Sequence, residues 1–370
     1  MNNTKIMVLV GTKAQFVKMA PVLLALDEIA APYSLVYTGQ HSETFDAMEV
    51  VFGIRGSDHN LIPNYEADTH LSFFRWTVLF WVRAFRKKFR KLWRDHEVFV
   101  VHGDTASTLY GACLGRIFRK KVAHVEAGLR SPTLWDPIPE EIIRRFVSRI
   151  AEIHYCPDDW SCSNLHKVSG RVVNTHGNTL HDSLQLALKR IGVSSLARKG
   201  NSKVSPYGIA SIHRNENLTR SKRLQFLVDS IIEASEGIPI KFVMHPATRK
   251  RLERNGLLEK LSSCDNIQLL DRMDYFEFVA LMVQARFLLT DGGSNQEESA
   301  ELGIPCLLLR IHTERRDGLG KNVELSCLKP DRIREFVDRH RSAKWDSRID
   351  LNSAICPSLT IATSLKNELS

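Results

Sequence analysis

The chain has 370 residues, with 51 basic and 42 acidic side chains and a formal net charge of +9. Hydrophobic residues make up 43% and charged residues 25%, a globular balance that excludes a disordered, collagen-like or disulfide-stapled chain. No apolar run is long enough to span a membrane, and the N-terminus lacks the apolar core of a secretory signal. The seven scattered cysteines form no Cys-x-x-Cys pair, so we expect reduced thiols in a cytoplasmic protein rather than a zinc site.

The first half of the chain alternates strand-like and helix-like segments. Its short apolar runs are typical of buried parallel strands, and longer mixed stretches separate them. Strands that alternate with helices predict βαβ units around a parallel sheet. The expected strands are 6–10, 33–37, 98–101 and 122–125, and the expected helices are 16–30, 43–52, 71–94 and 105–119.

The same alternation restarts after a polar stretch at 198–206, where we place a hinge. We therefore predict an α/β protein of two doubly wound, Rossmann-like domains that face a cleft. The predicted domains are residues 1–178 and 179–370, with the option that the final helix packs back on the first domain. The expected strands of the second half are 207–212, 240–243, 267–270, 287–289 and 305–309, and the expected helices are 221–236, 250–261, 275–284 and one from 296.

One helical segment, residues 71–95, has an unusual pattern. Its aromatic and aliphatic residues step by three or four and predict one apolar face, while residues 83–94 are densely basic. We expect this helix to be buried against its own domain or a twin subunit; the alternative is a helix lying on a membrane surface. The basic charge is too dispersed along the chain to indicate nucleic-acid binding. The expected apolar face consists of Phe74, Val78, Trp81, Phe85, Phe89 and Trp93.

Ligands of doubly wound sheets bind beyond the carboxyl ends of the strands, so the residues there are the candidate site. Neither the Gly-x-Gly-x-x-Gly fingerprint nor a Walker loop is present. The first strand instead runs into Gly-Thr-Lys-Ala-Gln at 11–15, with Lys18 on the next helical turn. A glycine turn at a helix start, with a nearby cation, can hold a phosphate; an ordinary strand–helix turn is the alternative.

A second glycine-rich turn, Asp-Gly-Gly-Ser-Asn-Gln-Glu-Glu at 291–298, lies between an expected strand and an expected helix. Its glycines would let backbone amides approach an anion at the helix start. Glu298 lies one turn into the helix and could accept hydrogen bonds from a ribose diol. The pattern favours a nucleotide-sugar site, with a plain N-cap at Asp291 as the alternative.

Three carboxylates, Asp104, Glu126 and Glu140, lie at or beyond strand ends of the first domain. A single acid at such a place is commonly a surface charge or a helix cap. Three at successive positions along one sheet edge favour acid–base chemistry.

These motifs together resemble the UDP-N-acetylglucosamine 2-epimerases of the non-hydrolysing bacterial type, which belong to the glycosyltransferase-B-like folds. The matching stretches run in family order over nearly the whole chain. They are residues 18–21, 39–41, 102–105, 124–130, 139–141, 177–179, 213–217, 296–298 and 313–315.

The resemblance implies an isomerase that needs no cofactor and no metal and takes a UDP-sugar as substrate. The helix at 71–95 adds the expectation of a homodimer. The resemblance places the catalytic groups on Asp104, Glu126, Glu140 and His213. The residues expected to bind the substrate or its UDP group are Lys13, Lys18, Gln40, His41, Arg130, Arg214, His245, Gly292, Gly293, Ser294, Glu298 and Arg315.

The chain departs from the family pattern at several of these turns. Lys13 stands where the family turn has arginine, which keeps the charge but loses the bidentate fork. The usual Asp-Ser-Gly-Gly is Asp-Gly-Gly-Ser at 291–294, and Arg316 replaces a proline. The segment 142–149 also differs from the family pattern.

The chemistry implied by the resemblance is inversion at C2 of the hexose, whose hydrogen is not acidic. Expelling UDP from C1 lets a carboxylate remove that proton, and re-addition with protonation from the other face inverts the centre. The enzyme would supply precursors of surface polysaccharides. The alternatives are a hydrolysing 2-epimerase, an epimerase of a modified UDP-sugar, a glycosyltransferase of the same fold, and an inactive homologue that only binds the nucleotide sugar.

Overall fold

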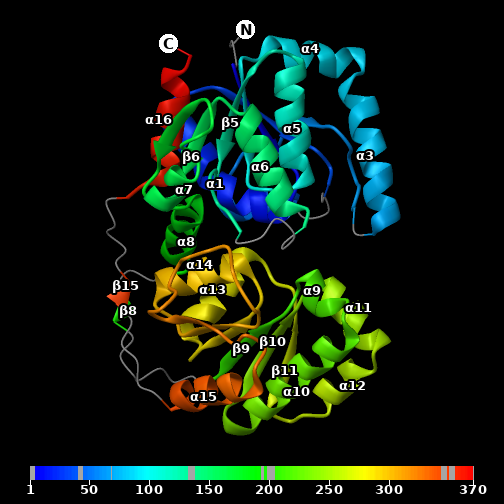
Figure 1. The fold of residues 1–370 in the computed structure, drawn as a ribbon, viewed down its shortest axis with the longest axis vertical. Helices are drawn as coiled ribbons and strands as arrows, with labels where there is room; N and C mark the ends of the chain where they lie inside the picture. The colour runs from blue at the N-terminus through cyan, green and yellow to red at the C-terminus, as the bar shows by residue number, and fades with distance from the viewer. Residues whose placement is uncertain are drawn as a thin grey trace. The chain divides into compact units, whose positions relative to one another are not determined.

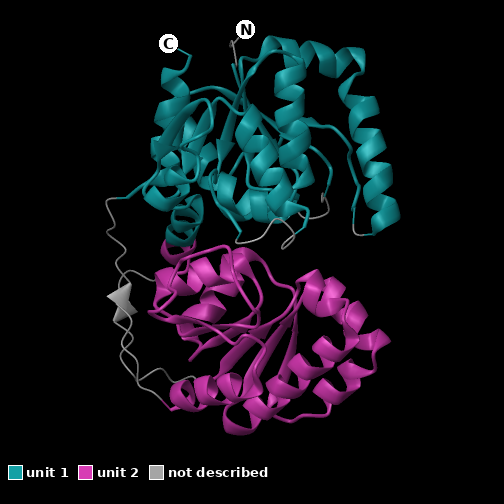
Figure 2. Cartoon of the chain, in the orientation of Figure 1, with its two compact units in different colours: residues 1–186, 353–370 teal, residues 187–352 magenta. Residues whose placement is uncertain are grey.

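The computed structural model describes residues 5–40, 45–67, 69–131, 138–192, 196–197, 205–342, 348–349 and 355–369. The chain divides into two compact units (Figure 2). Unit 1 comprises Met1–Leu186 and Ser353–Ser370, and unit 2 comprises Ala187–Asn352. Unit 1 therefore continues past residue 178, to Leu186, and includes the C-terminal helix. Each unit is a parallel sheet with interleaved helices, which confirms the predicted pair of Rossmann-like domains.

Unit 1 is built on a seven-stranded parallel sheet in the order β3-β2-β1-β4-β5-β6-β7 (Figure 1). The chain moves outward from β1 to β3 and then returns to the other side of β1, so the strand order reverses between β1 and β4. Turns that follow these two strands flank the crevice where such sheets bind ligands. The strands are β1 (Ile6–Val10), β2 (Tyr33–Tyr37), β3 (His59–Asn60), β4 (Val98–His102), β5 (Lys121–Val125), β6 (Ile153–Cys156) and β7 (Arg171–Asn174).

The helices of unit 1 cover this sheet, and the last of them comes from the C-terminus. α16 packs against α1, and Tyr155 of β6 donates a hydrogen bond of 3.0 Å to Ser364 (Figure 1). The C-terminal segment is thus part of the N-terminal fold. The helices are α1 (Lys13–Glu28), α2 (Phe45–Phe52), α3 (His70–Ala84), α4 (Lys87–Asp95), α5 (Ala106–Ile117), α6 (Glu140–Ile150), α7 (Asp159–Ser163), α8 (Thr179–Arg190, which continues into unit 2) and α16 (Pro357–Asn367).

Unit 2 repeats the design with six parallel strands in the order β11-β10-β9-β12-β13-β14. Its strand order reverses between β9 and β12. A short antiparallel pair, β8 (Leu196–Ala197) with β15 (Arg348–Ile349), completes its sheets. The strands are β9 (Gly208–Ser211), β10 (Ile240–Met244), β11 (Ile267–Asp271), β12 (Leu288–Thr290), β13 (Cys306–Leu308) and β14 (Val323–Leu325).

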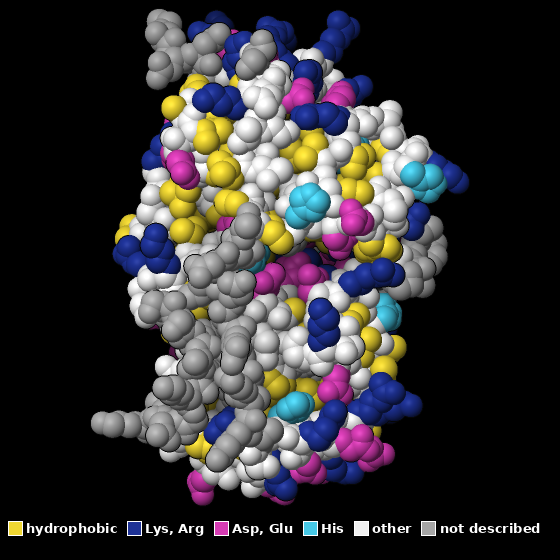
Figure 3. All heavy atoms as spheres, turned by 90° about the vertical axis from the view of Figure 1, so that its left-hand side faces the viewer, with side chains coloured by type: hydrophobic (Ala, Val, Ile, Leu, Met, Phe, Trp, Pro, Cys, Tyr) yellow, Lys and Arg dark blue, Asp and Glu magenta, His cyan; other side chains and the backbone are white. Residues whose placement is uncertain are grey.

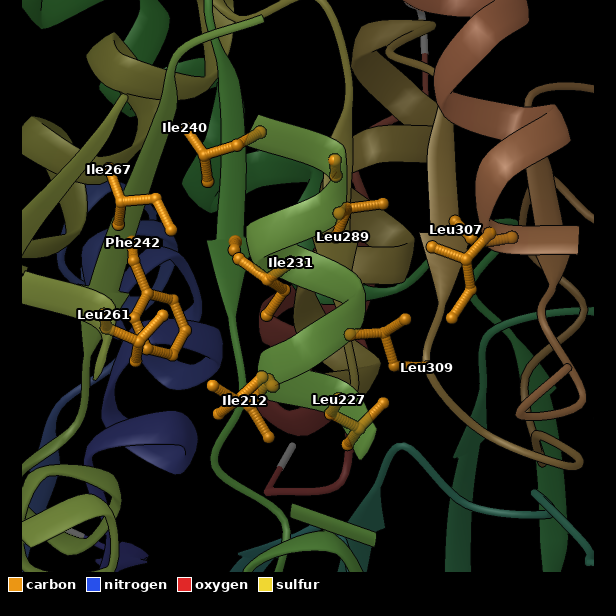
Figure 4. Packing of buried hydrophobic residues seen from close by; sticks show 14 of the residues in the cluster. Ile212, Leu227, Ile231, Ile240, Phe242, Leu261, Ile267, Leu289, Leu307 and Leu309 are labelled. Atoms are coloured by element: carbon orange, nitrogen blue, oxygen red, sulfur yellow. The ribbon is translucent and has the colours of Figure 1, made fainter. Parts of the chain in front are cut away.

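The core of unit 2 lies between this sheet and the helices that cover it. Leu227 and Ile231 of α10 point toward Phe242, Leu289 and other buried residues of the strands (Figure 4). The helices are α9 (Asn215–Leu218), α10 (Ser221–Gly237), α11 (Pro246–Arg254), α12 (Leu257–Ser262), α13 (Tyr275–Gln284), α14 (Gly293–Leu302) and α15 (Pro330–Arg341).

The prediction of a single helix at 71–94 is wrong, because the structure has two helices there. α3 ends at Ala84, Arg86 is extended with ψ of 148°, and α4 starts at Lys87. The break resets the helical phase, so the buried side of α3 differs from the expected face. Phe74 and Val78 are 64% and 47% exposed, so they do not belong to the core of unit 1. The side chains that reach the core from these two helices are Trp76, Phe80, Ala84, Phe89 and Trp93.

The expected helix at 250–261 is also two helices. α11 ends at Arg254, and α12 begins after Gly256, whose φ is 65°. A left-handed backbone angle is costly for residues with a side chain, so glycine marks the place where the first helix stops.

The surface carries basic and acidic side chains in a mixed pattern. On the face shown in Figure 3, lysine and arginine side chains are spread over each unit rather than gathered in one patch. Among the described residues, no helix combines the length and apolar character needed to cross a membrane.

Candidate functional site

In unit 1, the predicted site residues lie at the carboxyl edge of the sheet, on turns and helix starts next to the switch point. Glu126 directly follows β5 and has a φ of 62°, a strained angle that recurs at functional sites. The structure brings this edge together from several elements, although His41 lies outside the described residues. The predicted residues on it are Lys13, Lys18, Gln40, Asp104, Glu126, Arg130 and Glu140.

The Glu126 carboxylate is buried among groups that compensate its charge. Its side chain is 5% exposed and forms an ion pair with Lys18 of α1. Asn178 donates a hydrogen bond of 2.8 Å to Glu126 Oε2, and His102 Nε2 lies 3.5 Å from the same oxygen. A buried carboxylate is tolerated only with such partners, so these contacts position a charged group at the sheet edge.

Asp104 lies on the turn after β4, and its carboxylate is paired with an arginine. Asp104 Oδ2 is 2.5 Å from Arg144 Nη2, and Arg144 comes from α6. Glu140, the first residue of α6, is half-buried and lies one helical turn before Arg144. The structure thus brings two of the three predicted carboxylates onto neighbouring elements. Sequence reasoning missed the role of Arg144, because its partner is far away along the chain.

His124 supports the turn that carries Asp104. Complete burial lowers the pKa of this imidazole to about 3, although its hydrogen bond to the Gly103 carbonyl works in the opposite direction. His124 is therefore neutral, and its Nε2–H donates to Gly103 O over 2.7 Å. The sequence placed His124 inside a matching stretch but did not indicate this contact.

Gln15 joins the two turns at the switch point. Its side-chain oxygen accepts a hydrogen bond of 2.9 Å from Gly11 N, and its amide nitrogen donates to His102 O over 2.6 Å. Lys13, the first residue of α1, lies on the turn that Gln15 secures. Gln40 contributes a second link, because its side-chain oxygen accepts from Ser107 Oγ over 2.8 Å.

Arg130 lies beyond Glu126 and is directed toward α6. Its Nη2 donates to Ser148 Oγ over 3.1 Å. Burial lowers the pKa of its guanidinium below the ordinary value. Arg130 nevertheless remains a cation at neutral pH, since the ordinary value is above 12.

In unit 2, the turn after β12 carries a buried carboxylate that organises a neighbouring loop. Asp291 accepts hydrogen bonds from the backbone amides of His213 and Arg214, over 2.9 and 3.0 Å, and from the side chain of Asn217 over 2.9 Å. The N-cap of α14 is Gly292. The alternative reading of Asp291 as an N-cap is therefore wrong, because its oxygens serve the 213–217 loop.

The start of α14 has the features of an anion site. A Cβ at Gly293 would lie 2.8 Å from Arg315 Nε and 3.6 Å from Arg214 Nη2, so two guanidinium groups approach this glycine backbone. A helix N-terminus presents unpaired N–H groups, and cations beside it strengthen its attraction for a negative ligand. We call Gly292, Gly293, Ser294, Arg214 and Arg315 the anion cradle.

Buried carboxylates hold the two cradle arginines. Arg214 Nη2 donates to Glu314 Oε1 over 3.0 Å, and Arg315 forms an ion pair with Glu297. Burial would lower the pKa of Arg214, but the charges of Glu314, Glu216 and Asp291 raise it above its ordinary value. The carboxylate partners therefore keep the half-buried Arg214 charged.

The other predicted residues of unit 2 flank this cradle. Glu298 is buried on α14 and accepts a hydrogen bond of 3.0 Å from Asn295. His213 and His245 lie at two strand ends with ring centroids 6.2 Å apart. Nearby Tyr275 is half-buried, and desolvation together with the charges of Glu298 and Glu297 raises its pKa well above the ordinary value.

Comparisons with known proteins identify the family of this chain. The sequence model of the family described as UDP-N-acetylglucosamine 2-epimerase matches residues 25–351. A UDP-N-acetylglucosamine 2-epimerase homolog of Methanococcus maripaludis is 34% identical over 325 residues, covering 84% of this chain and 85% of the relative. The UDP-N-acetylglucosamine 2-epimerase of Neisseria meningitidis is 31% identical over 333 residues, covering 85% of each.

Solved structures show the same fold. The Methanocaldococcus jannaschii UDP-GlcNAc 2-epimerase, crystallised with UDP-GlcNAc and UDP, superposes with a TM-score of 0.84 at 28% identity, covering 98% of this chain and 100% of that one. The Neisseria meningitidis UDP-GlcNAc 2-epimerase bound to UDP-GlcNAc gives 0.79 at 25% identity, covering 99% of both. Together with the family match, these likenesses confirm the resemblance seen in the motifs: the chain belongs to the UDP-N-acetylglucosamine 2-epimerase family of isomerases.

Proposed function

We propose that this protein inverts C2 of UDP-N-acetylglucosamine without hydrolysis and gives UDP-N-acetylmannosamine. The observation that carries the proposal is the anion cradle of unit 2, in a chain whose unit 1 holds Asp104, Glu126 and Glu140 at one sheet edge. A nucleotide sugar needs both kinds of group, one to hold its diphosphate and one to move protons at the hexose. The relatives crystallised with UDP-GlcNAc support this choice of substrate.

In this proposal, unit 2 binds the nucleotide. The diphosphate lies against the α14 amides of Gly293 and Ser294, between the guanidinium groups of Arg214 and Arg315. Glu298 accepts hydrogen bonds from the ribose hydroxyls. Lys13 adds a further cation for the diphosphate. Charge-assisted hydrogen bonds of this kind are stronger than neutral ones, and they stabilise the departing diphosphate as its charge grows.

The chemical step follows from the weak acidity of the C2 hydrogen. The C1–O bond breaks and its electron pair leaves with UDP, while a carboxylate removes the C2 proton and the C2–H pair forms a C1=C2 double bond. The product of this step is 2-acetamidoglucal with UDP held beside it. Protonation of C2 from the opposite face and renewed C1–O bonding give the epimer. Two acid–base groups on opposite faces are needed, and Asp104, Glu126 and Glu140 are our candidates, with His213 assisting.

Product analysis tests the proposal against its rivals. We expect incubation with UDP-N-acetylglucosamine to yield a second nucleotide-linked anomeric signal in the proton NMR spectrum. A free sugar would instead show a hydrolysing epimerase. An unchanged spectrum from a protein that does bind UDP would favour a modified UDP-sugar substrate or an inactive binding homologue. We place the reaction in the cytoplasm, as a supply of surface-polysaccharide precursors.

We also propose a homodimer formed through the outer face of α3. This helix lies at the edge of unit 1 (Figure 1), and it exposes an apolar stripe that burial against a twin subunit would cover. An exposed stripe of this kind marks an interaction surface. The stripe consists of Leu71, Phe74, Val78 and Val82, which are 59%, 64%, 47% and 55% exposed.

Light scattering tests the homodimer. We expect twice the chain mass for the wild type and a monomer for Phe74→Ser with Val78→Ser, because the change makes the stripe polar without touching the core. The alternative is that the basic helix α4, next to α3, binds an anionic membrane surface. A wild-type monomer that co-sediments with anionic liposomes would overturn the dimer and show a membrane-surface helix.

A further inference from the structure

Arg144 has no role in the reaction as described so far, although it joins two elements that carry acid–base candidates. It lies on α6 four residues after Glu140, so the two side chains share one face of the helix. Its side chain is only 5% exposed, and its Nη2 is 2.5 Å from Asp104 Oδ2. Arg144 therefore connects the helix of Glu140 to the turn of Asp104.

The other end of the Arg144 guanidinium is held by Glu141. The Glu141 side chain is completely buried, and its Oε2 lies 3.5 Å from Arg144 Nη1. The backbone amide of Ser131 donates to Glu141 Oε2 over 2.9 Å, and Arg145 Nε donates to Oε1 over 2.7 Å. Glu141 is thus fixed by two donors besides Arg144, and it fixes Arg144 in turn.

We propose that Arg144 is a positioning residue, which sets the place of the Asp104 carboxylate relative to Glu140. Its planar guanidinium contacts two carboxylates at once, Asp104 and the buried Glu141 that follows Glu140 on α6, which a lysine cannot do. This matters because an acid–base group displaced by about 1 Å can lose roughly 100-fold in rate. The inference rests on the proposed function, since it assigns Asp104 and Glu140 to proton transfer.

Kinetics of three variants test this role. We expect Arg144→Gln to lower kcat by about 10- to 100-fold with little change in KM, since the anion cradle of unit 2 is untouched. Arg144→Lys should recover part of the loss, because it returns a cation to Asp104 without the second contact. Arg149→Gln is the matched control: Arg149 is an exposed arginine of the same helix, outside the Glu141 contacts, and its loss should leave kcat within about 2-fold.

A double-mutant cycle separates a positioning role from a direct one. If Arg144 acts through Asp104, the variant that combines Asp104→Asn with Arg144→Gln should be no slower than Asp104→Asn alone. Losses that multiply would mean that Arg144 acts on the substrate by itself, and the inference would be overturned. A KM increase for Arg144→Gln that exceeds its loss of kcat would overturn it as well.

Unfolding in denaturant gives a readout that needs no turnover. Asp104→Asn and Arg144→Gln should each lower the midpoint, and the double variant should lower it by less than the sum, because both changes remove one contact. If Arg144→Gln does not fold, the same cycle is run with Arg144→Lys. A wild-type chain without turnover would overturn the proposed function. Additive midpoint losses in a chain that does turn over would overturn the role of Arg144 alone.

Discussion

The sheet of unit 1 runs β3-β2-β1-β4-β5 across its switch point, and the sheet of unit 2 runs β11-β10-β9-β12-β13 in the same pattern. The two switch points nevertheless carry opposite arrangements of charge. In unit 1, the cations Lys18 and Arg144 hold the candidate carboxylates Glu126 and Asp104. In unit 2, the carboxylates Glu314 and Glu297 hold the cations of the anion cradle.

This difference shows how one topology presents two kinds of charged group. The strand order determines where a ligand can approach. The side chain that pairs with each candidate group determines whether a carboxylate or a cation faces that ligand. A carboxylate held by a cation suits proton transfer, whereas a cation held by a carboxylate suits a diphosphate. We therefore expect substitutions to act differently in the two units. Removing a candidate carboxylate of unit 1 should lower the rate, whereas removing a cradle arginine of unit 2 should weaken binding of the diphosphate.

The largest effect should come from the carboxylates of unit 1. We expect Asp104→Asn, Glu126→Gln and Glu140→Gln each to lower kcat by about 100- to 10,000-fold, since each removes a positioned acid or base. UDP affinity, measured by calorimetry, should change little because the anion cradle remains. Asp95→Asn, on an exposed carboxylate, serves as the control. Near wild-type rates in all three variants would remove these residues from the site.

A smaller effect, on affinity rather than rate, should follow removal of a cradle arginine. We expect Arg315→Ala to weaken UDP binding by about 10- to 100-fold, because it removes a charge-assisted contact and leaves Glu297 buried without its cation. Arg316→Ala, next along the chain and exposed, is the matched control for calorimetry. Equal losses in both variants would argue against a specific cradle.

The histidine behind Asp104 should make the stability of unit 1 depend on pH. The folded pKa of His124 is about 3, below the unfolded value of about 6.5, so the unfolded chain binds more protons between these pH values. Stability contributed by neutral His124 is therefore full above about pH 6.5 and falls by roughly 1 kcal/mol per pH unit below it. Denaturant unfolding from pH 7 to 4.5 measures this slope.

His124→Gln gives the matched comparison for that slope. Glutamine can still donate a hydrogen bond toward Gly103 O but does not titrate, so the slope should become shallower. His96 and His154 are buried as well, and burial lowers their pKa values in the same direction, which leaves a residual slope. An identical slope in wild type and variant would show that His124 titrates normally in the fold.

The smallest effect should come from Lys13, which sharpens the comparison because it is a unit 1 cation assigned to the diphosphate. We expect Lys13→Ala to weaken UDP binding several-fold while uridine binding hardly changes, since uridine lacks the diphosphate. Lys13→Arg should bind at least as well as lysine, because it adds a second donor to the diphosphate. Equal losses for UDP and uridine would place Lys13 elsewhere.

Much of the fold could be predicted from the sequence because buried parallel strands are continuous apolar runs. β1 and β2 begin and end where their apolar runs do. β7, Arg171–Asn174, was not predicted, since this edge strand is partly exposed and carries no such run. The break between α3 and α4 was also missed, because neither proline nor glycine marks it and the backbone at Arg86 leaves the helix without a local signal.

The candidate site could be predicted as residue types but not as contacts. Asp104, Glu126 and Glu298 were identified from motifs that lie next to strand ends. The residues that pair with these carboxylates were not predicted. Asp104 and Arg144, for example, are distant in sequence, and tertiary packing alone brings them together. The contacts of Asp291 were not predicted for the same reason, since its partners come from the 213–217 loop.

The most direct test of the account follows the C2 hydrogen during turnover in heavy water. If UDP is eliminated and re-added, the proton removed by one carboxylate is not the one delivered to the other face. UDP-N-acetylglucosamine should then give an epimer that carries solvent deuterium at C2, and long incubations should release a little 2-acetamidoglucal with UDP. An epimer that retains protium fully at C2 would contradict elimination and point to oxidation and reduction at a neighbouring carbon.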